Sequence, residues 1–308
     1  MRQPEIVRAG SLLLALVLAV PVVRGAERVV ATTAFLIEFA DPRATTLSSV
    51  TAPPVEAPRA LPGVAADGYT PRRLAPPTPL VLVPGVTPDG KNDARARAAA
   101  RLLARLGFDV TLPTVPGLTS GRLRPDDARP VVIALGAARR PAVIVSVSIG
   151  SGPALLAAAD PRVRDRVALV VSLGGYASAS ELVRFYLTGA YRFGAEAGHQ
   201  RHDPRLVAAF VAANADLLEP SARLDDILSA LSPLRVAGDL RAPLILIHGR
   251  DDPTVPFTES LRMAAARPRG TSLVLLRTLG HVGAEGAGLD WRVAMRLWQA
   301  AYRLARVA

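Results

Sequence analysis

The sequence contains no cysteine, and it has only four histidines among 308 residues. Without cysteine the chain cannot form disulfides, thiolate-bound zinc, iron–sulfur clusters or a thiol nucleophile. Four histidines leave little room for a histidine-rich metal site. Aromatic residues make up only 5% of the chain and Lys91 is the single lysine, so nearly all of the net charge of +11 comes from arginine. These arginines are spread without basic runs or interleaved aromatics, and we therefore expect no nucleic-acid partner.

The remaining composition is that of a folded protein. Apolar residues make up 50% of the chain, which excludes wholesale disorder. Charged residues make up 20% and there are 27 prolines, a combination that excludes a coiled coil. At about 150 residues per domain, the length fits two domains or one large α/β domain with extensions.

The N-terminus carries the pattern of a targeting segment. Residues 9–23 contain no charge, Arg2 and Arg8 precede them, and Arg24 follows. This pattern predicts a signal peptide or an N-terminal membrane anchor over residues 1–28, with a buried helix as the alternative. We accordingly expect a location at the cell envelope, either anchored by the N-terminus or exported, with membrane contact through this segment.

Residues 29–79 are predicted to form an extended lead-in to the main domain. Eight prolines lie between positions 53 and 79. Proline has no amide donor, so it excludes a long helix or a central strand there. Short edge strands are expected, for example over Thr45–Thr51 and Gly63–Tyr69.

Residues 80–308 alternate apolar strands with helices, which predicts a mostly parallel sheet covered by helices on both faces. Residues 176–240 are polar and helical in pattern, and they read as a cap inserted between the fourth and fifth core strands. The expected strands are 79–85, 108–112, 142–147, 167–173, 243–249 and 272–279; the expected helices are 94–106, 126–137, 149–159, 257–266 and 291–307. In the last helix, Trp291, Met295, Trp298 and Tyr302 recur at helical spacing and are expected to pack in the core.

The segment VSVSIGSG, residues 145–152, is typical of a nucleophilic serine at a sharp turn between a strand and a helix. Such a turn exposes the hydroxyl, and only small neighbours avoid a clash. The pattern places Ser148 at the apex, because an apex at Ser146 or Ser151 would put an isoleucine at a position that requires a small residue. Two other interpretations are a dinucleotide-binding turn, weakened by Leu155 at the third glycine position, and a serine-rich turn without activity.

The segment resembles the nucleophile motif G-x-S-x-G of the α/β-hydrolase family, with Ser146 at the first glycine position. Two later segments strengthen the resemblance. HGRDDPTVP (248–256) is similar to the family's acid segment and maps the catalytic acid to Asp252, with Asp251 as the neighbouring alternative. Gly280-His281 follows the last strand, where the family has its general base. Serine, acid and histidine stand in the family's order.

The resemblance implies a serine hydrolase that acts without a cofactor or metal, through an acyl-enzyme on Ser148. His281 would act as general base and acid, and Asp252 would orient it. The backbone amides of Ile149 and Val86 would form the oxyanion hole, although Pro84 replaces the family's usual histidine in the second loop. We expect a small-molecule acyl substrate and an ester-cleaving reaction.

Several alternatives stay open at this point. A peptidase, thioesterase or acyltransferase would use the same triad, and a catalytically silent binding protein at the envelope would share the fold. His199 and His202 form H-x-x-H in the cap; exposed polar residues are a better interpretation than metal ligands. The cap aromatics Phe185, Tyr186, Tyr191 and Phe193 could line an acyl pocket or anchor the cap. His248 is expected to be structural.

Overall fold

The structure is a computed structural model, and it describes residues 25–41, 43–200, 202, 204–215, 224–276 and 291–308. An eight-stranded sheet forms its centre, with strand order β1-β2-β4-β3-β5-β6-β9-β10. The strands are β1 (Val55–Pro58), β2 (Ala66–Thr70), β3 (Thr78–Val83), β4 (Phe108–Pro113), β5 (Ala142–Val147), β6 (Val167–Leu173), β9 (Leu244–Gly249) and β10 (Thr271–Leu276). From β4 to β10 neighbouring strands are parallel, whereas β2 pairs antiparallel with both β1 and β4.

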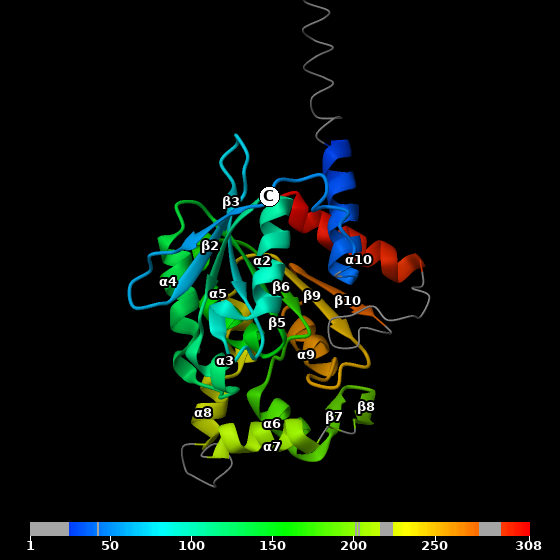
Figure 1. Ribbon diagram of the computed structural model, residues 1–308. Coiled ribbons are helices and arrows are strands. Elements are labelled where there is room, and N and C mark those ends of the chain that lie inside the picture. Colours follow the sequence, from blue (N-terminus) through cyan, green and yellow to red (C-terminus); the bar gives the residue numbers. More distant parts are fainter. Residues whose placement is uncertain (1–24, 42, 201, 203, 216–223, 277–290) are drawn as a thin grey trace, which may run out of the picture.

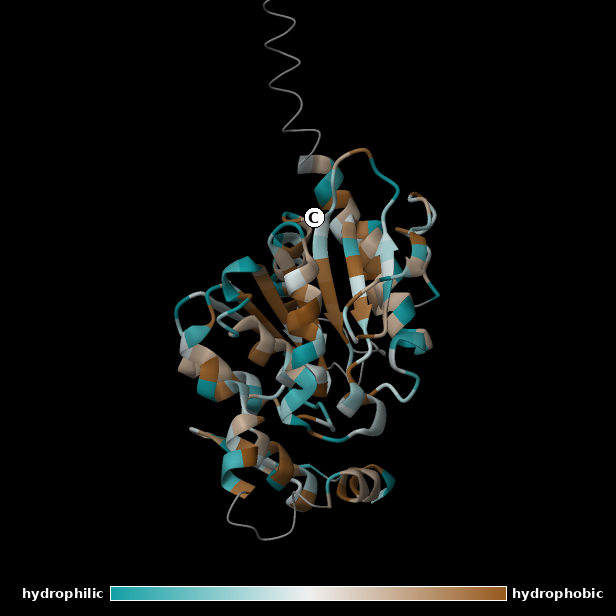
Figure 2. Cartoon of the chain, turned by 90° about the vertical axis from the view of Figure 1, so that its left-hand side faces the viewer, coloured by the Kyte–Doolittle hydropathy of each residue, from teal (hydrophilic) through white to brown (hydrophobic). Residues whose placement is uncertain are grey.

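Helices cover both faces of this sheet, as predicted (Figure 1). The main helices are α2 (Ala94–Leu106), α3 (Pro116–Ser120), α4 (Ala128–Ala137), α5 (Ser151–Ala158), α9 (Thr258–Ala266) and α10 (Trp291–Ala305). Successive strand residues point to opposite faces. Val81 and Ile144 therefore join the core with α4, α5 and α9, whereas Leu80 and Val143 join the core with α2 and α10. Figure 2 shows the apolar strands enclosed between helices with polar outer sides.

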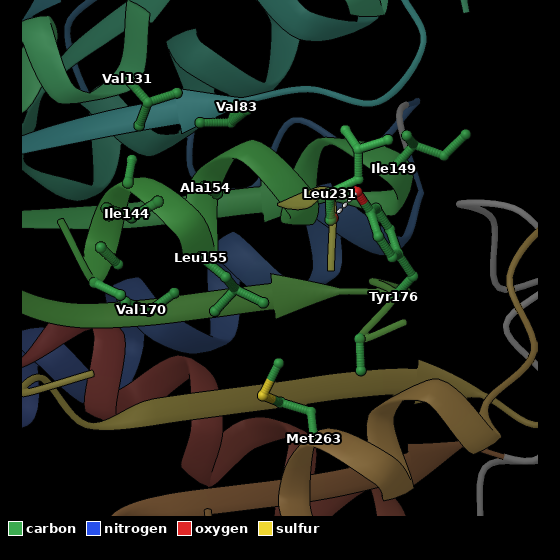
Figure 3. Packing of buried hydrophobic residues seen from close by; sticks show 14 of the residues in the cluster. Val83, Val131, Ile144, Ile149, Ala154, Leu155, Val170, Tyr176, Leu231 and Met263 are labelled. Atoms are coloured by element: carbon green, nitrogen blue, oxygen red, sulfur yellow. Dashed lines mark hydrogen bonds between the residues drawn. The ribbon is translucent and has the colours of Figure 1, made fainter. Parts of the chain in front are cut away.

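The first of these two cores lies directly behind the turn that follows β5. Val83, Ile144 and Val170 project from three adjacent strands toward Ala154 and Leu155 of α5 (Figure 3). The strands and α5 are thereby locked together by close packing, in which even one methylene matters. This packing gives the turn between β5 and α5 a rigid base.

The described residues within 176–240, between β6 and β9, form a layer of helices and one hairpin at the end of the molecule opposite to helix 25–40 (Figures 1 and 2). The layer contains α6 (Ala179–Thr188), the hairpin strands β7 (Ala190–Phe193) and β8 (Glu196–His199), α7 (Pro204–Ala213), α8 (Leu224–Ala230) and a 3-10 helix over Pro233–Asp239. The hairpin was not predicted. It turns at Gly194, whose φ of 58° suits glycine.

The lead-in differs from the prediction in its first part. Residues 25–40 are helical rather than extended, and Phe35 and Phe39 stack one helical turn apart, with ring centroids 5.9 Å apart. The strand expected over Thr45–Thr51 is instead a series of turns, because the carboxylate of Glu38 accepts hydrogen bonds from the Leu47 and Ser48 amides. A strand does form near the expected range Gly63–Tyr69, as β2, but it is not an edge strand, because it pairs with both β1 and β4 and β1 lies at the edge.

The C-terminal helix α10 forms as predicted, but its aromatic stripe does not enter the core. Trp291 is 69% exposed and Met295 is 45% exposed. The buried face instead consists of Ala300, Ala301, Leu304 and Ala305, whose mostly small side chains let the helix approach the sheet closely. Within the described residues, no helix is both long enough and apolar enough to span a bilayer; the segment 1–24 lies outside them.

Candidate active site

Ser148 occupies a strained turn between β5 and the helix that follows it. Its φ is 53°, and among the described residues it is the only non-glycine residue with a positive φ. This left-handed conformation costs an L-residue about 1–2 kcal/mol. The chain enters a 3-10 helix at Ser148 and continues directly into α5. Backbone strain of this kind is characteristic of functional turns, and a strand-to-helix turn presents the serine hydroxyl above the sheet.

Small residues around Ser148 are required by close backbone approaches. A Cβ atom at Gly150 would lie 2.0 Å from the carbonyl oxygen of Pro84, and one at Gly152 would lie 2.1 Å from the hydroxyl of Tyr176. A Cβ at Gly85 would lie 3.2 Å from the Cβ of Ser148. The loop after β3 therefore packs directly on the serine turn, and glycine at position 150 is a steric necessity.

The other two serines of the segment are occupied in structural contacts. Ser146 is fully buried, with its Oγ 3.4 Å from the carbonyl oxygen of Val171. Ser151 is also fully buried; its Oγ donates to the carbonyl of Ser148 at 2.8 Å and accepts from the amide of Tyr176 at 3.0 Å. Ser148 alone of the three is partly exposed. The geometry thus favours Ser148 over its neighbours as the reactive serine.

The predicted oxyanion donors lie on the two segments that meet at Ser148. Ile149 follows the serine within the 3-10 helix, so its amide lies at the start of a helical segment, where amides point outward. Val86 follows Gly85 in the packed loop and is 38% exposed. Pro84, which replaces the family's histidine, contributes the carbonyl that excludes a side chain at position 150. Both oxyanion assignments stay predictions.

Asp252 lies in the turn after β9, at the same edge of the sheet. Its Oδ1 accepts hydrogen bonds from the Thr254 amide (2.8 Å), the Thr254 hydroxyl (2.8 Å) and the Val255 amide (3.1 Å). A Cβ at Gly174, just beyond β6, would lie 3.0 Å from Asp252 Oδ2. The carboxylate therefore extends from β9 toward the end of β6, the strand beside β5. Its neighbour Asp251 is exposed.

His248 stabilises the turn that carries Asp252, which we call the acid turn. Its Nδ1 lies 2.7 Å from the Ser260 hydroxyl and its Nε2 lies 2.9 Å from the Val255 carbonyl oxygen. A carbonyl oxygen accepts only, so Nε2 carries the proton and Nδ1 accepts from Ser260. Burial lowers the pKa of His248, against the opposing effect of Asp252, whose Oδ2 lies 3.7 Å from Nε2. The residue is a neutral structural histidine, in agreement with the sequence-based interpretation.

His281, the predicted general base, lies outside the described residues. The last described residue before it is Leu276, at the end of β10, which pairs in parallel register with Gly249 at the end of β9. The chain therefore leaves β10 at the edge that carries Ser148 and Asp252. The assignment of His281 remains a prediction.

The cap contacts the acid turn through His202. Its Nε2 lies 2.8 Å from the Phe185 carbonyl oxygen and its Nδ1 lies 3.2 Å from the Pro253 carbonyl oxygen. Phe185 and Tyr186 are buried, and Tyr186 stacks on Phe210 with centroids 4.2 Å apart. These contacts suit the anchoring alternative for the cap aromatics.

Tyr191 and Phe193, the other two predicted cap aromatics, also contact residues outside the cap. Tyr191 packs edge-on against Phe257, and Arg262 lies over the Phe193 ring. His199, the partner of His202 in the H-x-x-H pattern, is exposed on the hairpin. No group of three or more potential metal ligands occurs within the described part of the chain.

Glu259, on α9, links the cap to the α/β domain. It was not identified from the sequence. It is 1% exposed, and its Oε2 accepts hydrogen bonds from the amides of Ala177 (3.0 Å) and Ser178 (2.7 Å), where the cap begins. Arg262 pairs with Glu259 at 3.1 Å and with Glu181 of α6 at 3.3 Å. Burial raises the pKa of Glu259. A lone acidic residue near a helix start carries no motif that could have revealed this contact.

Two hollows lie near this region. A cavity of about 320 Å³ lies within the cap, lined by Ser178, Ser232 and Arg235 among others, and does not reach Ser148. A narrow hollow of about 10 Å³ adjoins Ile149, and its lining includes Asp127 and Tyr176. It offers room for about one water molecule. The candidate site lies at the strand ends, beside the strained serine, and not at the larger cavity.

Comparison with known proteins identifies the fold. No family model matches the sequence, and no curated protein matches it either. Among solved structures, acylaminoacyl peptidase from Pyrococcus horikoshii superposes with a TM-score of 0.61 and 17% identity, over 84% of this chain and 42% of the peptidase. The 2,6-dihydroxy-pseudo-oxynicotine hydrolase superposes with a TM-score of 0.54 and 17% identity, over 89% of this chain and 78% of that enzyme.

A dienelactone hydrolase from Anabaena variabilis superposes with a TM-score of 0.50 and 17% identity, over 81% of this chain and 96% of that enzyme. The chain thus spans less than half of the peptidase but most of the two smaller hydrolases. With its mostly parallel sheet and its strained serine turn after β5, the chain has the α/β-hydrolase fold. The fold predicted from the sequence is confirmed.

Proposed function

We propose that the protein is a serine hydrolase that cleaves a carboxylic ester, or a related acyl bond, through an acyl-enzyme on Ser148. The observation that carries this proposal is the positive φ of Ser148 at the turn between β5 and α5. The acid turn at Asp252 lies on the same sheet edge, and structures with this fold include two hydrolases and a peptidase. Fold alone does not determine function, and the strained serine turn is the local feature that favours a nucleophilic role for Ser148.

The proposed reaction has two steps. Ser148 Oγ attacks the acyl carbonyl carbon while His281 takes its proton, and the resulting oxyanion receives hydrogen bonds from the Ile149 and Val86 amides. His281 then returns the proton to the leaving alcohol, which leaves the acyl group on Ser148. Water, deprotonated by His281, attacks this ester; the bond to Ser148 Oγ breaks, His281 returns the proton to Oγ, and the acid is released. Asp252 orients His281 and stabilises its charged form.

Labelling with a fluorophosphonate probe tests the nucleophile. We expect the wild-type protein to gain one probe per chain by intact mass, and Ser148→Ala to gain none. Ser146→Ala is the matched control, because Ser146 is buried against Val171 and its loss leaves the turn's geometry in place. Labelling that persists in Ser148→Ala would assign the nucleophile to another residue, and a folded wild type that does not label would favour a silent binding protein. Either result would contradict the proposal.

A paired substrate series tests the bond type. The p-nitrophenyl esters of short acids and the p-nitroanilides of the same acids differ only in the bond that is cleaved. We expect ester hydrolysis that Ser148→Ala abolishes, with slower or no amide hydrolysis. Faster anilide hydrolysis would identify a peptidase, and acyl transfer to added alcohols or amines in preference to water would identify an acyltransferase.

We also propose that the chain acts at the cell envelope, with residues 1–28 as a signal peptide or an anchor. The support for this is the uncharged run over residues 9–23 between arginines. The N-terminal mass of the mature protein distinguishes cleavage from retention of this segment.

A further inference from the structure

Two adjacent helices at the end of the molecule opposite to the cap expose large apolar side chains. On α10, Trp291 and Met295 are 69% and 45% exposed, and on helix 25–40 the exposed fractions are 42% for Val29, 64% for Val30 and 46% for Ile37. Single exposed apolar residues are ordinary, but such residues gathered on neighbouring helices indicate an interaction surface.

The two helices form one continuous face. On α10, positions 291, 295, 298 and 302 lie on one side of the helix, and Trp298 stacks on Tyr302 with centroids 4.9 Å apart. The indole Nε1 of Trp298 donates a hydrogen bond to Thr33 Oγ1 at 3.0 Å. Thr33 lies one helical turn from both Val29 and Ile37. Figure 1 shows helix 25–40 crossing α10. We call this surface the tryptophan face.

The two helices together carry a net positive charge, which comes from α10. The α10 sequence contains Arg292, Arg296 and Arg303 and no acidic residue, and Arg292 lies over the Trp291 ring at 5.6 Å. Of these, Arg303 donates a hydrogen bond to Ser272 Oγ of β10 at 2.6 Å. On helix 25–40, the charges of Glu27 and Arg28 offset each other, and the Glu38 carboxylate accepts hydrogen bonds from the Leu47 and Ser48 amides. Arginine beside tryptophan and aliphatic residues suits the boundary of an anionic bilayer, where guanidinium groups pair with phosphates and indoles lie among the headgroups.

The position of the face along the chain also favours a bilayer over a protein partner. The uncharged run of residues 9–23, with arginines on both sides, leads directly into helix 25–40. Both views place that helix at the end of the molecule away from the cap (Figures 1 and 2). We propose that the tryptophan face lies on the surface of an anionic phospholipid bilayer, with Trp291 and Met295 among the headgroups and Arg292 and Arg296 on lipid phosphates; this inference rests on the proposed location at the cell envelope.

Intrinsic fluorescence can test this face alone, because both tryptophans of the protein lie on α10. The full chain would be added to vesicles of phosphatidylcholine and phosphatidylglycerol that carry a doxyl-labelled lipid near the headgroups. We expect quenching and a blue shift on these vesicles. Both effects should weaken on phosphatidylcholine alone or at high salt, because salt screens surface charge.

A matched pair of variants locates the contact. Met295→Asp places a charge in the tryptophan face and is expected to weaken the vesicle interaction on the order of tenfold, as followed by quenching. Leu187→Asp is the control, because Leu187 is 52% exposed on α6 in the cap, far from the tryptophan face. The tryptophan quenching of this variant should match that of the wild type. Both positions are exposed, and thermal unfolding by circular dichroism verifies that both variants fold.

Three outcomes overturn the proposal. The first is the absence of quenching on anionic vesicles, and the second is equal quenching of Met295→Asp and the wild type, which would assign binding to another segment. The third is a dimer that forms in sedimentation experiments as the protein concentration rises. Met295→Asp would dissociate this dimer, and vesicles would have no effect on the fluorescence of the protein. That result would make the tryptophan face a contact between two copies of the chain.

Discussion

The two turns that carry Ser148 and Asp252 lie at the same sheet edge, but different interactions determine their conformations. The serine turn is shaped by steric constraint: a positive φ, and a loop whose carbonyl excludes any side chain at Gly150. The acid turn is shaped by hydrogen bonds, since Oδ1 of Asp252 accepts three of them from the two residues that follow Pro253.

This difference shows which changes each turn should tolerate. A sterically shaped turn can lose the hydroxyl of its central residue without losing its form, but it cannot accept larger neighbours. A hydrogen-bonded turn can lose its charge if an acceptor oxygen remains, but it should loosen when that oxygen is removed.

The variant Asp252→Asn should separate the acid turn's structure from its chemistry. The amide oxygen of the new side chain can accept the same bonds from Thr254 and Val255, so the free energy of unfolding should change little. The lost charge no longer orients the general base, so kcat on p-nitrophenyl esters should fall by about 10⁴-fold. Asp251→Asn, on the exposed neighbour, should retain activity. The opposite ranking of the two variants would move the acid to Asp251.

Replacing Gly150 by alanine should distort the serine turn. The new Cβ would lie 2.0 Å from the Pro84 carbonyl, so the loop after β3 must shift. Overpacking of this kind costs about 1–3 kcal/mol, and urea unfolding would measure it. Gly136→Ala is the control, because nothing lies within 4 Å of a Cβ there and the position is in α4, where alanine gains up to about 1 kcal/mol. Equal stability of the two variants would refute the steric account.

The central strands and the serine turn could be predicted from the sequence because local chemistry determines them. The apolar runs of β5 and β6 match the predicted ranges 142–147 and 167–173 at both ends. The nucleophile turn was predictable because only small residues permit its geometry. Helix α2 also ends as predicted, at Gly107, whose φ is 118°.

Features that depend on distant partners could not be predicted. The turns over residues 45–51 depend on the Glu38 carboxylate, and the junction at Glu259 depends on amides about 80 residues earlier in the chain. The aromatic stripe of α10 was assigned to the core because spacing reveals which residues share a face, but not whether that face is buried. In the structure the alanine-rich face is turned inward instead.

Comparing glycine with alanine at position 148 tests the backbone strain of the serine turn directly. Glycine adopts a positive φ without steric cost, whereas alanine does not. Ser148→Gly and Ser148→Ala both lack the hydroxyl, and both should be inactive. If the left-handed conformation at position 148 is intrinsic to the turn, the glycine variant should be more stable than the alanine variant by about 1 kcal/mol in urea unfolding.

The matched control has the reverse order. Ala98 is exposed in the middle of α2, where Ala98→Gly should cost about 1 kcal/mol. Glycine favoured at position 148 and disfavoured at position 98 would show that strain, rather than a general effect of glycine, acts at the serine turn. Glycine disfavoured at both positions would mean that Ser148 adopts an ordinary right-handed conformation, and the steric half of the comparison would then fail.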